Sequence, residues 1–221
     1  MDALSIAQAY AVFLLYSQGE KAAYPDNTQS GYILMAAFLE LFFSGAIETD
    51  KKQRIRLHTP PGSKKYLQAI GEEIADGPPR TLGGWLEYYL SGFSDKDIHT
   101  VVCGVLDSLQ EEGWLHPKGK GLFRTKYTLE PGKTQQAVED FRIALLHGGR
   151  VGSQTQALAL LLHQSGVLRA LFSHEEEKKV QARLEDFQDH PMRRPIALIQ
   201  KVLDHCDTEA AFLNWQMNEF Y

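Results

Sequence analysis

The sequence has few cysteines, and this scarcity excludes two kinds of architecture. Cys103 and Cys206 are the only two among 221 residues, which allows neither a disulfide framework nor the spacing of a cysteine metal site. Such cysteine usage fits a reducing compartment. Cys103 lies beside an apolar helical stripe, so we predict a buried, inert thiol there.

The sequence also lacks a membrane-spanning segment and a secretory signal. The longest apolar stretch, residues 33–47, is interrupted by Glu40, Ser44 and Gly45, and no run approaches the roughly 18 apolar residues of a spanning helix. Asp2 and the absence of basic residues before the first apolar ones do not fit a signal peptide. We therefore expect a cytoplasmic protein whose contact with a membrane is at most peripheral.

Positive charge is not in excess either. The net charge is −5 and the pI is near 5.9, so any phosphate or anionic lipid must be bound by a local patch. A hydrophobic content of 43% and a charged content of 23% are those of an ordinary globular protein with a packed core. No repeat or low-complexity linker divides the chain, and we predict one domain over residues 1–221.

No catalytic constellation is visible in the sequence. None of the eight histidines pairs with another at helical spacing, and neither HExxH nor CxxC occurs. His99 and Cys103 are four residues apart, but a nucleophile pair needs a third, orienting group and an oxyanion site, and the sequence shows neither. The turn around Lys120 lacks the flanking strand and helix of a phosphate-binding loop. We predict a protein that is not an enzyme and uses no metal and no cofactor.

The hydrophobic periodicity predicts a mainly α protein with two small β-hairpins. Residues 31–44 are apolar on nearly every side, which is typical of a central, buried helix. Ser5 with Gln8 and Ser153 with Gln156 have the spacing of capping boxes. We expect helices over residues 4–17, 31–44, 63–75, 81–90, 94–112, 134–146, 157–172, 175–187, 195–205 and 208–221, and hairpins over 47–58 and 114–129.

Residues 94–131 are the most informative segment, because an amphipathic helix there leads directly into a basic hairpin. Ser94 with Asp97 predicts the helix start, and Gly113 its end. We expect residues 117–121 to form the turn of the hairpin. The second strand then places Tyr127 on one face and Lys126 on the other. A basic hairpin delivered to the surface suggests an anionic partner.

Both hairpins are basic. The first carries Lys51, Lys52, Arg54 and Arg56, and the second carries Lys118, Lys120, Arg124 and Lys126. Solvated strands commonly expose such residues, so each set is typical of a solvated strand as well as of a binding patch. Trp85, Tyr88 and Tyr89 have a similar ambiguity, and their helical spacing favours the core over a stacking surface.

A helix followed by a basic hairpin also resembles a winged-helix DNA-binding domain. The helix that precedes the wing would enter the major groove and should present basic or amide side chains. Here it carries Lys96 as its one basic residue against five acidic ones, which are Asp95, Asp97, Asp107, Glu111 and Glu112. DNA phosphates repel that charge, so binding of nucleic acid through this helix is disfavoured.

A different resemblance explains more of the chain. From Leu4 to Phe172 the sequence resembles the Golgi phosphoprotein 3 family, whose landmarks occur in the same order. These landmarks are an N-terminal amphipathic helix and residues 36–47 (AAFLELFFSGAI), 82–86 (LGGWL), 109–115 (LQEEGWL), 122–127 (LFRTKY) and 157–172. The resemblance implies a mostly helical single domain.

In eukaryotic members, the resemblance implies binding of phosphatidylinositol 4-phosphate at Golgi membranes and retention of glycosyltransferases through their cytosolic tails. The lipid pocket of the family uses a tryptophan and three arginines, at positions that align with Pro25, Leu34, His99 and Val102. None of the four residues matches. We therefore expect a divergent member, of bacterial origin, that does not retain the specific lipid pocket.

The predicted function is that of a non-enzymatic peripheral membrane adaptor whose partner is an anionic, phosphoinositide-like lipid or a protein tail. The predicted headgroup-binding residues are Lys96, His99, Lys118, Lys120, Arg124 and Lys126, with Leu122 at the hairpin tip as the membrane contact. Two alternatives stay open: a winged-helix-like regulator that contacts nucleic acid through the hairpin alone, and a protein-interaction scaffold. A homo-oligomer is compatible with each.

Overall fold

Helix α2 (Asn27–Phe43) is the centre around which the other helices pack. The computed structural model describes residues 4–19, 22–91, 95–120, 125–147 and 149–218, and at 95–97, 119–120 and 207–218 it describes the backbone only. Every residue of α2 from Ser30 to Leu39 is buried, because the helix is apolar on all sides. It contacts α1, α4, α5, α7 and α9. The prediction of a central, buried helix is confirmed.

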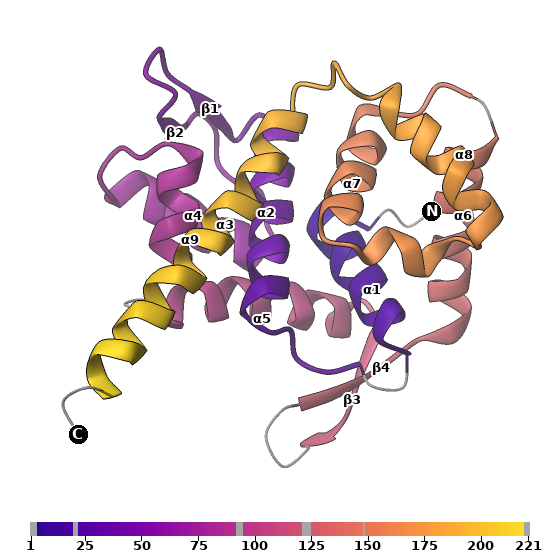
Figure 1. The fold of residues 1–221 in the computed structure, drawn as a ribbon, viewed down its shortest axis with the longest axis horizontal. Helices are drawn as coiled ribbons and strands as arrows, with labels where there is room; N and C mark the ends of the chain where they lie inside the picture. The colour runs from indigo at the N-terminus through magenta and orange to yellow at the C-terminus, as the bar shows by residue number, and fades with distance from the viewer. Residues whose placement is uncertain (1–3, 20–21, 92–94, 121–124, 148, 219–221) are drawn as a thin grey trace.

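The described part of the chain is mainly helical, with two antiparallel hairpins, as predicted. The other elements are, in order, α1 (Ile6–Gln18), β1 (Ile47–Thr49), β2 (Ile55–Leu57), α3 (Lys65–Asp76), α4 (Leu82–Leu90), α5 (Asp95–Glu111), β3 (Leu115–Lys120), β4 (Thr125–Leu129), α6 (Pro131–Leu146), α7 (Ser153–Gln164), the 3₁₀ helix η2 (Val167–Leu171), α8 (His174–Glu185) and α9 (Arg193–Asn218). Figure 1 shows α1, α6, α7 and α8 on one side of α2, and α3, α4 and the β1–β2 hairpin on the other.

Capping residues determine where the first two helices begin. Ser5 and Gln8 form the predicted capping box of α1. Asp26 and Gln29 form a second box, so α2 begins at Asn27 and not at Gly31 as predicted. The three-residue spacing of a box is the same in both cases, and the turn-forming residues around Asp26 concealed the second one.

Helix boundaries in the C-terminal part of the chain also differ from the prediction. The expected helix over residues 157–172 is divided, because Gly166 adopts φ +77° and separates α7 from η2. The first residue of α7 is Ser153, and its N-cap is Gly152 without a side-chain cap, so the predicted box at Ser153 is wrong. Residues 195–205 and 208–221 were expected as two helices, whereas α9 runs unbroken through Asp207.

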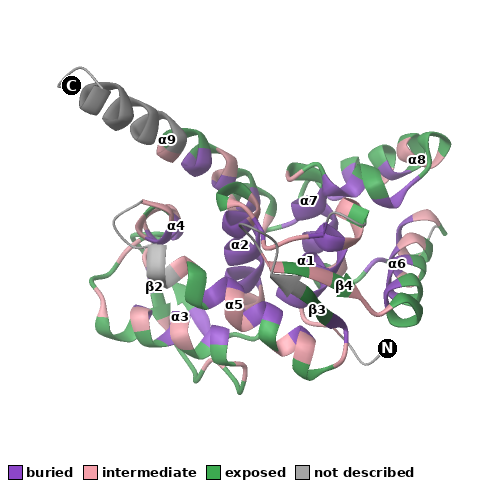
Figure 2. Cartoon of the chain, turned by 90° about the horizontal axis from the view of Figure 1, so that it is seen from below, coloured by how far each residue is buried: buried purple, intermediate pink, exposed green. Residues whose placement is uncertain are grey.

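The helices supply most of the buried core (Figure 2), and the hairpins contribute Ile47, Ile55 and Leu115 to it. Trp85 and Tyr89 are buried as predicted, and Tyr88 lies at the edge of the same cluster. Gln8 is a fully buried polar residue whose amide nitrogen donates to Ser108 and Glu112, which ties α1 to α5 and the residue that follows it. Within the described residues, no helix combines the length and the apolar character needed to cross a bilayer.

Candidate functional site

The β3–β4 hairpin projects from one edge of the molecule (Figure 1). Its strands pair antiparallel, with Leu115 opposite Leu129 and Pro117 opposite Tyr127, and the register shifts before Lys120. The turn expected at residues 117–121 is therefore wrong for its first four residues, which belong to β3. Pro117 cannot donate a ladder hydrogen bond, yet it is tolerated in this two-stranded sheet.

The segment between α1 and α2 attaches to this hairpin as a third, very short strand. Tyr24 N–H donates to the Thr125 carbonyl at 2.9 Å, and Tyr127 N–H donates to the Ala22 carbonyl at 3.0 Å. Ala23 forms a β-bridge with Lys126. The hairpin is thus fixed to the helical body at the point where α2 begins.

Tyr24 also joins the hairpin to the start of α5. Its hydroxyl lies 2.6 Å from Nδ1 of His99, and Nε2 of the same imidazole lies 3.4 Å from the Cys103 sulfur. The His99 side chain is exposed. The structure therefore places His99 beside the strand that carries Lys126, and Tyr24, which was not among the predicted site residues, makes the link. No local signal marks Tyr24, because its partner His99 is 75 residues away.

The third group that a Cys–His pair needs is thus present, but the thiol is not activated. Burial raises the pKa of the Cys103 thiol, and Asp107 raises it further against the opposing effect of the Tyr24 hydrogen bond. The neutral thiol is a poor nucleophile. Cys103 is only half-buried, so the prediction of a buried thiol is wrong, whereas a raised pKa fits the predicted inertness.

Lys118 and Lys126 are basic residues of the hairpin whose side chains are described, and both are exposed. Lys118 directly follows Pro117 and Lys126 directly precedes Tyr127, the residue paired with Pro117, so the two lysines lie on adjacent strands where the register shifts. Among the described residues neither lysine has a salt bridge. Of the other predicted residues, Lys96 and Lys120 are described in backbone only. Leu122 and Arg124 lie outside the described residues.

The β1–β2 hairpin has a different electrostatic arrangement. Asp50 Oδ2 lies 2.7 Å from Nη2 of Arg54 and 3.2 Å from Nη2 of Arg56. The hydrogen bonds that Arg54 donates from its side chain and backbone hold the pKa of the Asp50 carboxyl well below its usual range. This hairpin and β3–β4 project from different edges of the molecule (Figure 1), so their charges do not form one patch.

Of the four positions that the sequence resemblance predicts to correspond to the lipid pocket of the family, three are buried. Leu34 and Val102 belong to the core, and Pro25 is buried directly before the N-cap of α2. His99 is the exposed one. The described side chains at these positions therefore present one imidazole and no arginine to a ligand.

The exposed face of α5 is acidic where its side chains are described. Asp107 and Glu111 are exposed there, as is Glu112 directly after the helix, and Lys65 is 3.8 Å from Glu111. A recognition helix needs positive charge at this face to approach DNA phosphates. Within the part of the chain that the structure describes, no group of three His, Cys, Asp or Glu side chains could hold a metal ion.

Comparison with known proteins agrees with this fold. The family model described as Golgi phosphoprotein 3 (GPP34) matches residues 9–204, which includes the central helix, the cluster at His99 and both hairpins. No curated protein matches the chain. Members of the matched family are non-enzymatic adaptors that bind lipids and protein partners. The predicted bacterial origin stays a prediction. From its helical architecture and this match over most of its length, the chain belongs to the Golgi phosphoprotein 3 family.

Proposed function

We propose that this protein is a peripheral membrane adaptor that binds anionic lipid through the β3–β4 hairpin and the start of α5. The observation that carries the proposal is the pair Lys118 and Lys126, two exposed residues on adjacent strands with no acidic partner among the described residues. They lie on a hairpin at an edge of a chain whose net charge is −5. A localised positive patch on an acidic protein favours one orientation toward an anionic surface.

Tyr24 extends this patch to the start of α5. Its hydrogen bonds to Thr125 and His99 keep the imidazole next to the strand that carries Lys126. In the proposal, Lys96, Lys120 and Arg124 add to the same charge, because they lie beside these residues in the sequence, and Leu122 contacts the bilayer. These basic residues form the proposed lipid-headgroup site.

The proposed site recognises charge and not one headgroup. A specific phosphoinositide pocket needs several fixed donors around one phosphate. Two of the aligned pocket positions, Leu34 and Val102, are buried apolar residues, which supports the loss of such a pocket. Each base near an anionic surface contributes about 1 kcal/mol, so four or five bases bind reversibly and respond to salt.

Co-sedimentation with lipid vesicles tests the proposal. The wild-type protein should sediment with phosphatidylcholine vesicles that contain phosphatidylserine, remain in solution with pure phosphatidylcholine, and be released by salt. Vesicles that carry phosphatidylinositol 4-phosphate at equal surface charge should bind it equally. The Lys118→Gln, Lys126→Gln double variant should bind about thirtyfold more weakly, since two bases are lost.

The matched control is the Lys51→Gln, Lys52→Gln double variant. It removes the same charge from exposed residues of the other hairpin and should leave binding unchanged. Equal losses in both double variants would show that overall charge, and not the β3–β4 hairpin, attracts the protein. Sedimentation that does not depend on anionic lipid would overturn the proposal. A strong preference for phosphatidylinositol 4-phosphate at equal charge would show that a specific pocket is present.

A further inference from the structure

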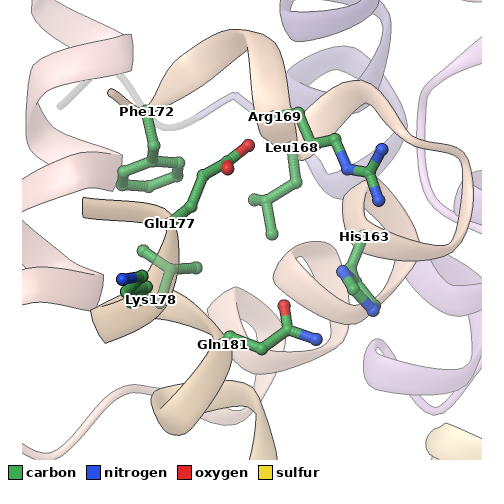
Figure 3. A pocket seen from close by; sticks show the side chains of 8 residues that line it. His163, Leu168, Arg169, Phe172, Glu177, Lys178 and Gln181 are labelled. Carbon is green, nitrogen blue, oxygen red and sulfur yellow. The ribbon is translucent and has the colours of Figure 1, made fainter. Parts of the chain in front are cut away.

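A second candidate site lies away from the hairpin, where α7, η2 and α8 meet. A pocket of about 340 Å³ opens there, and its lining side chains come from these elements and from Phe172 directly after η2. Figure 3 shows these side chains arranged around a common opening. The volume falls in the range of about 300–1,000 Å³ that is usual for small-molecule sites.

The floor of this pocket is apolar. Leu168, Phe172 and Val180 line it, and all three are buried in the core. The ring of Phe172 packs against the ring of Phe141, with centroids 6.4 Å apart, so α6 supports the floor from behind. An apolar surface of this kind can accept a short hydrocarbon chain.

The rim of the pocket is positively charged. Arg169 and Lys178 are exposed lining residues, and within the described part of the chain neither forms a salt bridge. Figure 3 places Arg169 and His163 on one side of the opening and Lys178 on the other. Burial lowers the pKa of His163, and Arg169 and then Arg193 lower it further, so Arg193 is a third nearby cation.

Glu177 is the acidic residue among the lining side chains. Its carboxylate oxygen lies 3.4 Å from Nδ1 of His174, a residue outside the lining. One carboxylate against Arg169 and Lys178 leaves the lining side chains net positive. This local charge is opposite in sign to that of the whole chain.

We infer that this pocket binds a small amphipathic anion of the fatty-acid type, with its head at the cationic rim and its chain on the apolar floor. A purely polar anion would leave the floor exposed to water, and a purely apolar molecule would desolvate the rim without compensating its charge. The inference goes beyond the proposed function, because these residues belong to elements other than the hairpin and bind a ligand in free solution.

Octanoate is a suitable probe, and the methyl NMR signals of Leu168 and Val180 are suitable reporters. Below its micellar concentration, octanoate should shift both signals saturably. Acetate lacks the chain and octanol lacks the charge, so each should bind at least tenfold more weakly. Octyl phosphate tests whether a phosphate head serves as well as a carboxylate. An absence of saturable shifts with octanoate, or equal binding of octanol, would overturn the inference.

Surface variants test the rim without disturbing the core. The Arg169→Gln, Lys178→Gln double variant should weaken octanoate binding at least tenfold, whereas the Lys51→Gln, Lys52→Gln control should not change it. The two proposals can fail separately. Octanoate binding should be unaffected in the Lys118→Gln, Lys126→Gln variant, and vesicle binding unaffected in the Arg169→Gln, Lys178→Gln variant. Loss of vesicle binding in the latter variant would instead assign these cations to a membrane surface and overturn the inference of a free ligand.

Discussion

The two hairpins carry similar basic sequences but expose different charges. In β1–β2, Asp50 at the turn lies within salt-bridge distance of both Arg54 and Arg56. In β3–β4, Lys118 and Lys126 are exposed and have no such partner among the described residues. Lys51 and Lys52 of the first hairpin are exposed like Lys118 and Lys126, so the difference lies in the arginines of β1–β2, which share the carboxylate of Asp50.

The two hairpins are attached to the body in the same way but with different consequences. Each is extended by a third segment: Arg54 of the first forms a bridge with Thr81, and Lys126 of the second forms one with Ala23. The segment at Thr81 leads directly into α4. The segment at Ala23 instead carries Tyr24 to His99 and so builds the candidate site.

The largest expected effect is on the free energy of unfolding, and it tests whether the two hairpins are anchored equally in the core. Leu115 at the base of β3–β4 and Ile47 at the base of β1–β2 are both buried. Leu115→Ala and Ile47→Ala should each lower the free energy of unfolding by about 2–5 kcal/mol, because each leaves a cavity. Urea denaturation measures both. A loss below about 1 kcal/mol for only one variant would show that its hairpin is not anchored in the core and that the difference is not only electrostatic.

The core and the helix ends follow from local signals in the sequence. The capping box of α1 at Ser5 was predicted because it depends on residues within one turn, whereas the expected amphipathic helix is buried on all sides from Ile6 to Leu15. The box at Asp26 was missed because Pro25, Asp26 and Asn27 are also typical of a loop. The division of α7 from η2 depends on Gly166. A glycine is also compatible with a continuous helix, so the sequence did not predict this division.

The candidate site depends on contacts that the sequence does not encode locally. His99 and the basic residues were predicted from residue type, but the contact between Tyr24 and His99 spans 75 residues. The pairing of Asp50 with Arg54 spans four residues, yet a strand pattern does not indicate which acid faces which base. The charges of each hairpin can therefore be counted from the sequence, whereas which of them are paired is known only from the structure.

Removal of the acid should make the first hairpin behave like the second. Asp50→Asn keeps an oxygen that can accept the backbone hydrogen bonds of the turn but no longer neutralises Arg54 and Arg56. In this variant the first hairpin, which does not bind lipid in the wild type, should become a second lipid-binding surface, so binding to phosphatidylserine vesicles should rise about fivefold, as expected for one unit of charge near an anionic surface. The Glu48→Gln variant is the matched control, because Glu48 is on the same hairpin and lies 3.9 Å from His58. An equal rise in both variants would show that only net charge matters.

The reverse change should make the second hairpin behave like the first. Thr128 is exposed two residues after Lys126 on β4, so an acid there faces the same side as the lysine. Thr128→Asp should lower vesicle binding about fivefold, and Thr128→Asn should not. If Asp and Asn lower the binding equally, the effect comes from the shape of the strand and not from charge at Lys126.

The smallest effect concerns the pH dependence of the first hairpin. Because the pKa of Asp50 is lowered in the folded protein, the ionised carboxylate of this residue stabilises the folded state. That contribution is present above the unfolded pKa of about 3.9 and is lost as the pH falls toward the folded value. The difference in Tm between the wild type and Asp50→Asn should therefore be largest near neutral pH and narrow in acid.

The Lys51→Gln, Lys52→Gln variant keeps Asp50, so its Tm difference from the wild type should not narrow in the same range. If the Asp50→Asn difference stays constant down to acid pH, the carboxylate is not what stabilises the arrangement of Arg54 and Arg56. Those arginines would then be as available to lipid as the lysines of β3–β4. Charge pairing would no longer explain why the second hairpin, and not the first, binds lipid. A difference that narrows supports the opposite conclusion, because the same carboxylate then both stabilises the first hairpin and pairs with its two arginines.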